Sequence, residues 1–227
     1  MVTGVGSGTG RSLVEKFGAE GYQVAMMARK TERLEAFARE IPNTHAFPCD
    51  VTDESAVNNV LQAIDGKLGA VDVLVHNAVG GAFGHFLEID SRTLQTNFDI
   101  NVKSLLHLCQ SLIPSMASRG HGVVLATGNT SAYRGKANFA AFAPTKAAQR
   151  ILLESIARHA GPQGVHVGYV AIDAVIDLPW TRRSFPEKPD DFFCKPADIA
   201  AECYRIAHQP RSAWSFNVEI RPYAENW

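Results

Sequence analysis

Cysteine is scarce in this sequence, and its placement excludes two kinds of small stabilised domain. The four cysteines, Cys49, Cys109, Cys194 and Cys203, form no C-x-x-C pair, so neither a disulfide framework nor a zinc site is indicated. Long apolar runs are also lacking, and glycines and an arginine interrupt the N-terminal residues, which is not typical of a signal peptide. We therefore expect a cytoplasmic protein with no bound metal and no membrane partner.

The sequence also has no excess of charge of one sign. It carries 22 Lys and Arg against 23 Asp and Glu, a formal net charge of -1, so it offers no basic field to attract nucleic acid. Its 227 residues, 46% of them hydrophobic, are enough for one well-buried core. We expect a single domain spanning 1–227 that acts on a small-molecule substrate.

Glycine is concentrated near the start, in the segment VTGVGSGTGR at 2–11. Glycine has no Cβ, so such a run permits positive φ and lets an anion approach the backbone amides, ahead of a helix expected at 12–20. The spacing G-x-G-x-x-G does not fit, whereas T-G-x-x-x-G-x-G fits with Thr3, Gly4, Gly8 and Gly10. A tight turn is the alternative, and the segments that follow decide between the two.

Short apolar runs alternate along the chain with amphipathic stretches. The first strand is expected to be short, because only two residues precede Thr3, unless the natural start lies upstream. Further strands are expected at 23–28, 44–47, 71–76, 122–126, 166–172 and 214–220. Helices are expected at 31–40, 54–68, 91–119, 140–160 and 197–208. This alternation predicts an α/β fold: a doubly wound parallel sheet, or Rossmann fold, with helices on both faces and the ligand at the carboxyl ends of the strands.

The segment 177–195, DLPWTRRSFPEKPDDFFCK, is the least regular part of the chain. Three prolines, mixed charge and aromatic residues predict a surface loop, and a lid over the ligand site is the alternative.

Several further segments agree with the glycine loop in order and spacing. Asp50-Val51 follows the third strand, His76-Asn-Ala-Val-Gly80 follows the fourth, and Asn101 lies in the next helix. With these features the sequence resembles the short-chain dehydrogenase/reductase family over essentially its whole length. The resemblance implies a nicotinamide dinucleotide cofactor held by Gly4, Ser7, Gly8, Thr9, Gly10, Arg29, Asp50, Val51, Asn77, Ala78, Lys146 and Ile176.

The end of the second strand bears on which cofactor binds. An NAD enzyme needs a carboxylate there to accept the ribose hydroxyls, and Ala28 occupies that position. Arg29 follows, and a guanidinium can grip a 2′-phosphate with two charge-assisted hydrogen bonds, although a solvated cation is the alternative reading. The sequence favours NADP over NAD.

The family's catalytic motif is altered in this chain. The family has Tyr-x-x-x-Lys with a serine thirteen residues before the tyrosine, whereas here Phe142 precedes Lys146 and Asn129 replaces the serine. The enoyl-reductase position for the tyrosine, seven residues before the lysine, is Phe139. The resemblance therefore implies catalytic roles for Asn101, Asn129 and Lys146 only.

Three further residues are assigned to the substrate pocket. Phe142 is either core filler or an apolar wall against the substrate, and Tyr133 is expected to line the pocket rather than to replace the missing acid. Asp173 stands where the family carries Pro-Gly, and it either caps a turn or places a carboxylate near the nicotinamide.

These features predict an NADP-dependent oxidoreductase of atypical short-chain type, which passes a hydride between the nicotinamide and a small carbonyl or conjugated alkene. The alternative is an NADP-binding sensor, a pseudoenzyme without turnover. The family's two long helices pair across a two-fold axis, so the resemblance implies a homodimer or homotetramer. Ala147, Ala148, Leu152 and Leu153 are expected to form that interface.

Overall fold

A parallel sheet of seven strands, in the order β3-β2-β1-β4-β5-β6-β9, forms the centre of the computed structural model, which describes residues 1–224. The strands are β1 Val2–Thr3, β2 Val24–Ala28, β3 Thr44–Pro48, β4 Val73–His76, β5 Gly122–Gly128, β6 Val165–Ile172 and β9 Asn217–Ile220. Every residue of β6 is buried, as expected for a strand whose two faces are both covered by helices.

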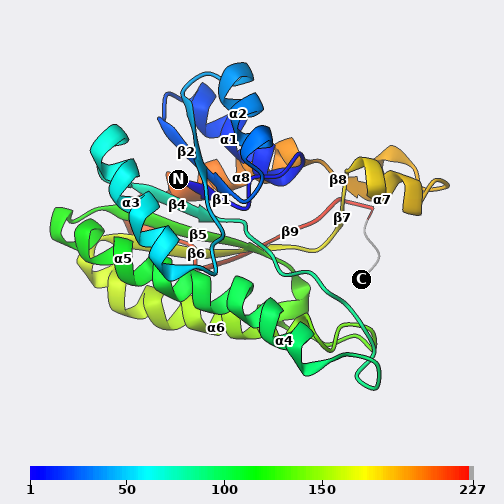
Figure 1. Ribbon diagram of the computed structural model, residues 1–227. Helices are drawn as coiled ribbons and strands as arrows, with labels where there is room; N and C mark the ends of the chain where they lie inside the picture. Colours follow the sequence, from blue (N-terminus) through cyan, green and yellow to red (C-terminus); the bar gives the residue numbers. More distant parts are fainter. Residues whose placement is uncertain (225–227) are drawn as a thin grey trace.

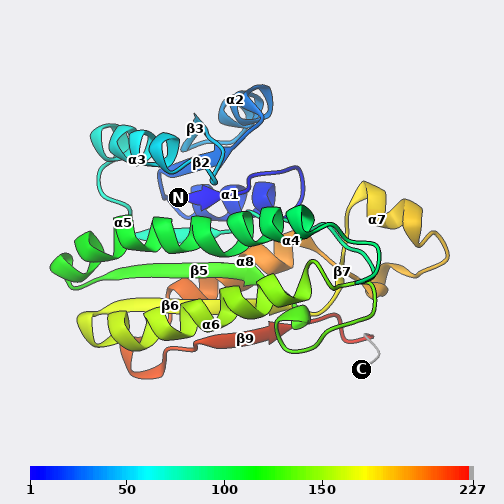
Figure 2. The same ribbon diagram turned by 60° about the horizontal axis from the view of Figure 1, so that its bottom comes forward.

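Helices cover both faces of this sheet (Figure 1). One face carries α1 Thr9–Ala19, α2 Thr31–Glu40 and α8 Pro196–Ala207, whose apolar residues join one core cluster. The other carries α3 Glu54–Leu68, α5 Ser104–Arg119 and α6 Ala143–Ala160, with a second core cluster beneath them; α5 and α6 lie side by side (Figure 2). The predicted doubly wound parallel sheet is confirmed.

The strand order reverses between β1 and β4. From β1 the chain proceeds outward to β2 and β3, and then returns to the other side of β1 to form β4, β5 and β6. The connections that leave the carboxyl ends of β1 and β4 therefore diverge, which opens a crevice at that edge of the sheet.

The helix predicted at 91–119 is interrupted. It consists of α4 Ser91–Phe98, a π-helical turn at Asp99–Lys103, and α5. Asn101 lies in that turn, and its backbone carbonyl accepts a hydrogen bond from Gln149 of α6. A π turn changes the i→i−4 pattern, and such turns occur frequently at functional sites.

Two other expectations are corrected. The helix predicted at 140–160 begins at Ala143, with Pro144 in its first turn, where the missing amide removes no intrahelical bond. The segment 177–195 is not all loop, because it contains α7 Pro179–Ser184 and β8 Phe193–Cys194, which pairs with β7 Val175–Ile176.

The face of α6 also differs in one residue from the predicted interface. Leu153 is 0% exposed and packs in the core beneath α5 and α6, so it is not available to a second subunit. Within residues 1–224, no helix is long and apolar enough to cross a membrane.

Candidate active site

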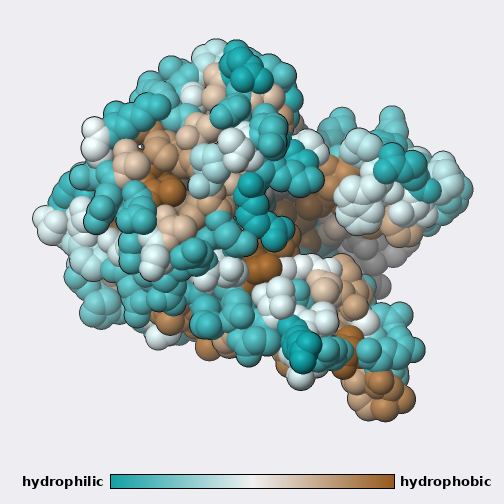
Figure 3. Space-filling model, viewed as in Figure 1, coloured by the Kyte–Doolittle hydropathy of each residue, from teal (hydrophilic) through white to brown (hydrophobic). Residues whose placement is uncertain are grey.

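A cavity of about 490 Å³ lies at the carboxyl ends of β1, β2, β3 and β4. Figure 3 shows the surface hollowed beside the α7 segment, with apolar residues on the floor of the hollow. Of the predicted cofactor residues, the cavity is lined by Gly4, Arg29, Asp50, Val51 and Ala78. The prediction thus named residues from four separate loops that the fold brings to one place.

The glycine loop owes its shape to close backbone contacts. Gly4 has φ +66°, and a Cβ there would lie 2.5 Å from the backbone of Ala78. A Cβ on Gly10 would lie 2.8 Å from the Gly4 carbonyl oxygen. Ser7 is exposed at the tip of the loop, and Thr9 begins α1, so the first amides of this helix are available to an anion.

Gly8 has a different neighbour, which the sequence did not indicate. A Cβ at Gly8 would lie 2.3 Å from Cδ2 of Leu178, so the leucine packs directly on the loop. Leu178 immediately precedes α7 in the segment 177–195. That segment therefore lies against the glycine loop.

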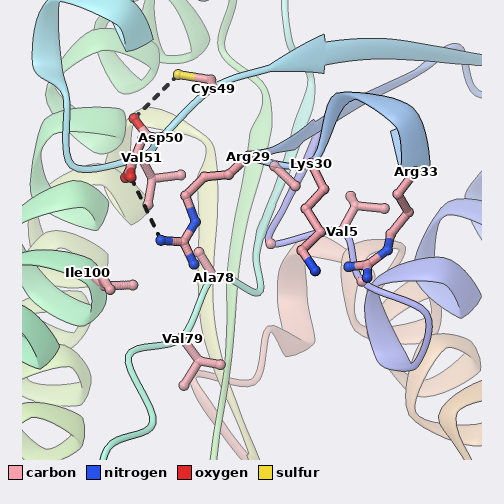
Figure 4. A pocket seen from close by; sticks show the side chains of 13 residues that line it. Val5, Arg29, Lys30, Arg33, Cys49, Asp50, Val51, Ala78, Val79 and Ile100 are labelled. Atoms are coloured by element: carbon pink, nitrogen blue, oxygen red, sulfur yellow. Dashed lines mark hydrogen bonds and ion pairs between the residues drawn. The ribbon is translucent and has the colours of Figure 1, made fainter. Parts of the chain in front are cut away.

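Three basic side chains line the cavity, and one of them, Arg33, reaches the glycine loop, with NH1 4.0 Å from where a Cβ on Gly6 would lie (Figure 4). Arg29 and Lys30 follow β2, and Arg33 lies in the first turn of α2. The Arg29 side chain is 74% exposed, and its NH1 lies 3.9 Å from Oδ2 of Asp50. Lys30 and Arg33 were not among the predicted residues. Their positions, one and four residues after Arg29, could have indicated that they lie near it at the cofactor site.

A chain of hydrogen bonds runs inward from the glycine loop. Asn77 Nδ2 donates to the Gly4 carbonyl (3.0 Å), and the Thr127 hydroxyl donates to Asn77 Oδ1 (2.9 Å). Lys146 Nζ donates to the Thr127 carbonyl (3.2 Å) and to Oε1 of Gln149 (2.5 Å). The same chain therefore holds both Asn77 and Lys146.

Asn101 is tied to the far end of this chain. Its Oδ1 accepts from the Gly80 amide (2.9 Å), and its Nδ2 donates to the Gly80 carbonyl (3.0 Å) and to Thr145 Oγ1 (2.9 Å). Asn101 is 0% exposed, so its side chain braces the segment after β4 against α6.

Burial changes the acid–base properties of Lys146. Its side chain is 2% exposed, and desolvation of the ammonium lowers its pKa to about 7. The neighbouring His76 is fully buried; burial, followed by the charge of Lys146, lowers its pKa to about 3, so the imidazole is neutral at pH 7. His76 Nδ1 is hydrogen-bonded to Thr3 Oγ1 (3.1 Å).

Phe142 lies in an aromatic cluster at the start of α6. It is 3% exposed, and its ring lies 4.9 Å from that of Phe83 and 6.2 Å from that of Phe139 between centroids. The ring offers no proton. One helical turn before Lys146, where the family has its phenol, this chain has the buried apolar ring of Phe142.

Asn129 follows β5, and a hydrogen bond to its side-chain oxygen holds the side chain in place. Its Oδ1 accepts from the Ser131 amide (3.1 Å), which leaves the side-chain NH₂ as the donor for a ligand. Its backbone N–H donates to the Tyr169 hydroxyl (3.2 Å), and the pKa of that buried phenol is raised mainly by desolvation. Tyr169 therefore remains protonated, and its hydroxyl is hydrogen-bonded to the backbone of Asn129.

Asp173 and Tyr133 make specific contacts of their own. Thr130 Oγ1 donates to Asp173 Oδ1 (2.5 Å), and Arg134 NH2 lies 3.4 Å from the same oxygen. The Tyr133 hydroxyl donates to Asn217 Oδ1 of β9 (2.5 Å), and Tyr133 lines a second hollow, separate from the cofactor cavity. Through its contacts with Thr130 and Arg134, Asp173 connects the end of β6 to the segment after β5.

Ile176, the last of the predicted cofactor residues, lies in β7. Its carbonyl accepts a hydrogen bond from the Thr181 hydroxyl (2.6 Å). The first turn of α7 is therefore tied to the strand that follows β6.

Known proteins share this architecture. The family model described as short chain dehydrogenase matches residues 1–181. The L-xylulose reductase of Bos taurus is 30% identical over 171 residues, which are 75% of this chain and 68% of that protein. An uncharacterized oxidoreductase of Staphylococcus epidermidis is 26% identical over 225 residues, covering 98% of this chain and 96% of that protein. A metagenomic short-chain oxidoreductase solved in complex with NADP superposes with a TM-score of 0.84 at 25% identity, covering 97% of this chain and 96% of that one.

The chain belongs to the short-chain dehydrogenase family. Family membership, together with the names of these relatives, makes it a nicotinamide-dependent oxidoreductase. The cavity suits such a cofactor, because the glycine loop at the start of α1 and three basic side chains line it together.

The buried lysine leads to a prediction about stability. Between the pKa of about 7 in the folded protein and the ordinary lysine pKa of 10.5, the unfolded chain binds more protons, so the contribution of Lys146 to stability rises with pH across this window. We expect Lys146→Met to stabilise the protein at pH 7, and this gain to shrink by about 2 kcal/mol between pH 7 and pH 9.

Urea unfolding of the native protein and of Lys146→Met at pH 7, 8 and 9 measures this difference. The two proteins share all other titrating groups, so the contributions of those groups cancel in the stability difference. Lys67→Met, which replaces an exposed lysine of α3, is the matched control. A stability difference for Lys146→Met that does not vary with pH would show that the amine is not buried as described.

Proposed function

We propose that this chain is a single-domain NADP-dependent oxidoreductase that passes a hydride between the cofactor and a small carbonyl or conjugated alkene. The observation that carries this proposal is that Arg29, Lys30 and Arg33 line the same cavity as the glycine loop. Ala28 stands where a carboxylate would favour NAD. A 2′-phosphate among three cations would be bound through charge-assisted hydrogen bonds.

Two residues outside the lining of the cavity, Asn129 after β5 and Lys146 of α6, support carbonyl chemistry. When bound, the nicotinamide supplies or accepts the hydride. The Asn129 NH₂ donates to the substrate oxygen and stabilises the negative charge that develops there. Lys146, whose pKa of about 7 lies near physiological pH, holds or releases a proton at Nζ, and it would bind a ribose hydroxyl of the cofactor.

One observation favours a sensor without turnover as the second candidate. Phe142 stands where the family has its phenol, and it is enclosed by Phe83 and Phe139. Loss of a positioned general acid typically costs about 10²–10⁴ in rate. Orientation and electrostatic stabilisation still leave room for slow catalysis, and turnover therefore decides between the two candidates.

We also propose that the protein is a symmetric dimer or tetramer. The helices α5 and α6 lie side by side and keep exposed apolar side chains, with Leu106 at 37% and Ile151 at 58% exposure. Ala147, Ala148 and Leu152 remain partly exposed on α6, which suits close packing of a second copy.

The first prediction concerns cofactor choice. NADPH should bind at least about tenfold more tightly than NADH, a difference of about 1.4 kcal/mol, because Arg29 and its neighbours meet the 2′-phosphate. Titration by nucleotide fluorescence measures both affinities. Arg29→Ala should reduce the preference, whereas Arg205→Ala, which removes an exposed arginine of α8, should not. Equal affinities for the two nucleotides in the native protein would contradict the NADP assignment.

The second prediction concerns turnover. The native protein should oxidise NADPH slowly with reactive carbonyls or conjugated alkenes, and Lys146→Ala should lower kcat/KM at least about tenfold. Phe142→Tyr combined with Asn129→Ser should raise carbonyl reduction, because it restores a phenol one turn from the lysine. If the native protein binds NADPH but turns over nothing across a broad panel, while the double variant is active, the sensor reading replaces the enzyme reading.

The third prediction concerns assembly. Light scattering at micromolar concentration should give the mass of a dimer or tetramer. Ile151→Glu should shift the protein toward monomer, because it places a charge in the apolar contact. A monomer for the native protein would refute the proposed interface.

A further inference from the structure

Gln149 is a buried amide that lies between two groups of the active site. It is 0% exposed and lies on α6, three residues after Lys146. Its Oε1 is 2.5 Å from Lys146 Nζ, and its Nε2 is 2.7 Å from the backbone oxygen of Asn101. One side chain therefore spans the space between the lysine and the π-helical turn.

The orientation of this amide is fixed by its partners. The Asn101 carbonyl only accepts hydrogen bonds, so it must face the NH₂ of Gln149, and the oxygen of Gln149 must then face Lys146. The reverse orientation would place NH₂ against the lysine donor and oxygen against the carbonyl oxygen. Gln149 thus presents a neutral acceptor to Nζ.

Lys146 has no charged partner to hold it. Within residues 1–224, no carboxylate lies within ion-pair distance of its Nζ, and the neighbouring titratable group, His76 of β4, is neutral at pH 7. Thr127 and Gln149 each accept one hydrogen bond from Nζ. An amine or ammonium offers three positions at nitrogen besides its carbon, so one position remains for a ligand.

We propose that Gln149 is a positioning residue that fixes Lys146 Nζ between α6 and the π turn, so that its remaining position points to the ribose of the bound cofactor. This inference rests on the proposed function, since it gives Lys146 a cofactor hydroxyl as partner. A purely structural role, in which Gln149 only ties α6 to Asn101, is the alternative.

A double-mutant cycle on NADPH affinity separates the two roles. Gln149→Met keeps the length of the side chain and removes both hydrogen bonds, and we expect it to weaken NADPH binding by about fivefold. In a Lys146→Met background, the same change should alter affinity less than about twofold, because there is no amine to position. Gln163→Met, which removes an exposed glutamine that donates to the His159 carbonyl, is the matched control.

A second measurement uses the protein without cofactor. Gln149→Glu places a carboxylate against Nζ and should raise the pKa of Lys146. The stability of the Gln149→Glu variant itself should therefore rise less between pH 7 and pH 9 than the stability of the native protein does. This arm also covers the case in which Gln149→Met does not fold.

Two results would overturn the proposal. One is a loss of NADPH affinity by Gln149→Met that is equal with and without Lys146, and the other is a pH dependence that Gln149→Glu leaves unchanged. If the native protein does not bind NADPH, the proposed function fails, and the pH measurement alone then decides whether Gln149 holds the lysine.

Discussion

The close approach of the end of β1 to the end of β4 is the constraint on which the active site depends. A Cβ on Gly4 would lie 2.5 Å from Ala78, and the Thr3 hydroxyl accepts hydrogen bonds from the backbone amides of Asn77 (3.2 Å) and Ala78 (3.3 Å). Because these two strands mark the point where the strand order reverses, fixing them together fixes the mouth of the cavity. The inner chain of hydrogen bonds begins at this contact.

The parts of the site that the sequence predicted are those carried by local spacing. Gly4, Arg29, Asp50 and Ala78 each follow a strand, and in a parallel sheet the ends of strands meet at one edge, so pattern alone brings them together. Gln149 was missed because a polar residue inside a helix is usually exposed, and only the packing of α6 against the π turn buries it.

The π turn and the contact of Leu178 with Gly8 were out of reach for a similar reason. The contact joins residues far apart in the chain, and the π turn interrupts the helix without breaking the helical pattern of the sequence in its segment. Periodicity reports which face of a segment is buried, and it does not report which side chain from another element fills the space against it.

Replacement of the phenol by Phe142 alters what Lys146 requires from its surroundings. A phenol beside an ammonium benefits from the positive charge and can exchange a proton with the amine, whereas the ring of Phe142 offers no proton. Burial lowers the pKa of Lys146 to about 7, and the groups in contact with Nζ, the Thr127 carbonyl and the Gln149 amide, are neutral acceptors that also suit an uncharged amine. Burial, with only uncharged acceptors described at Nζ, therefore suits a lysine that exchanges its proton near neutral pH rather than one that keeps a permanent charge.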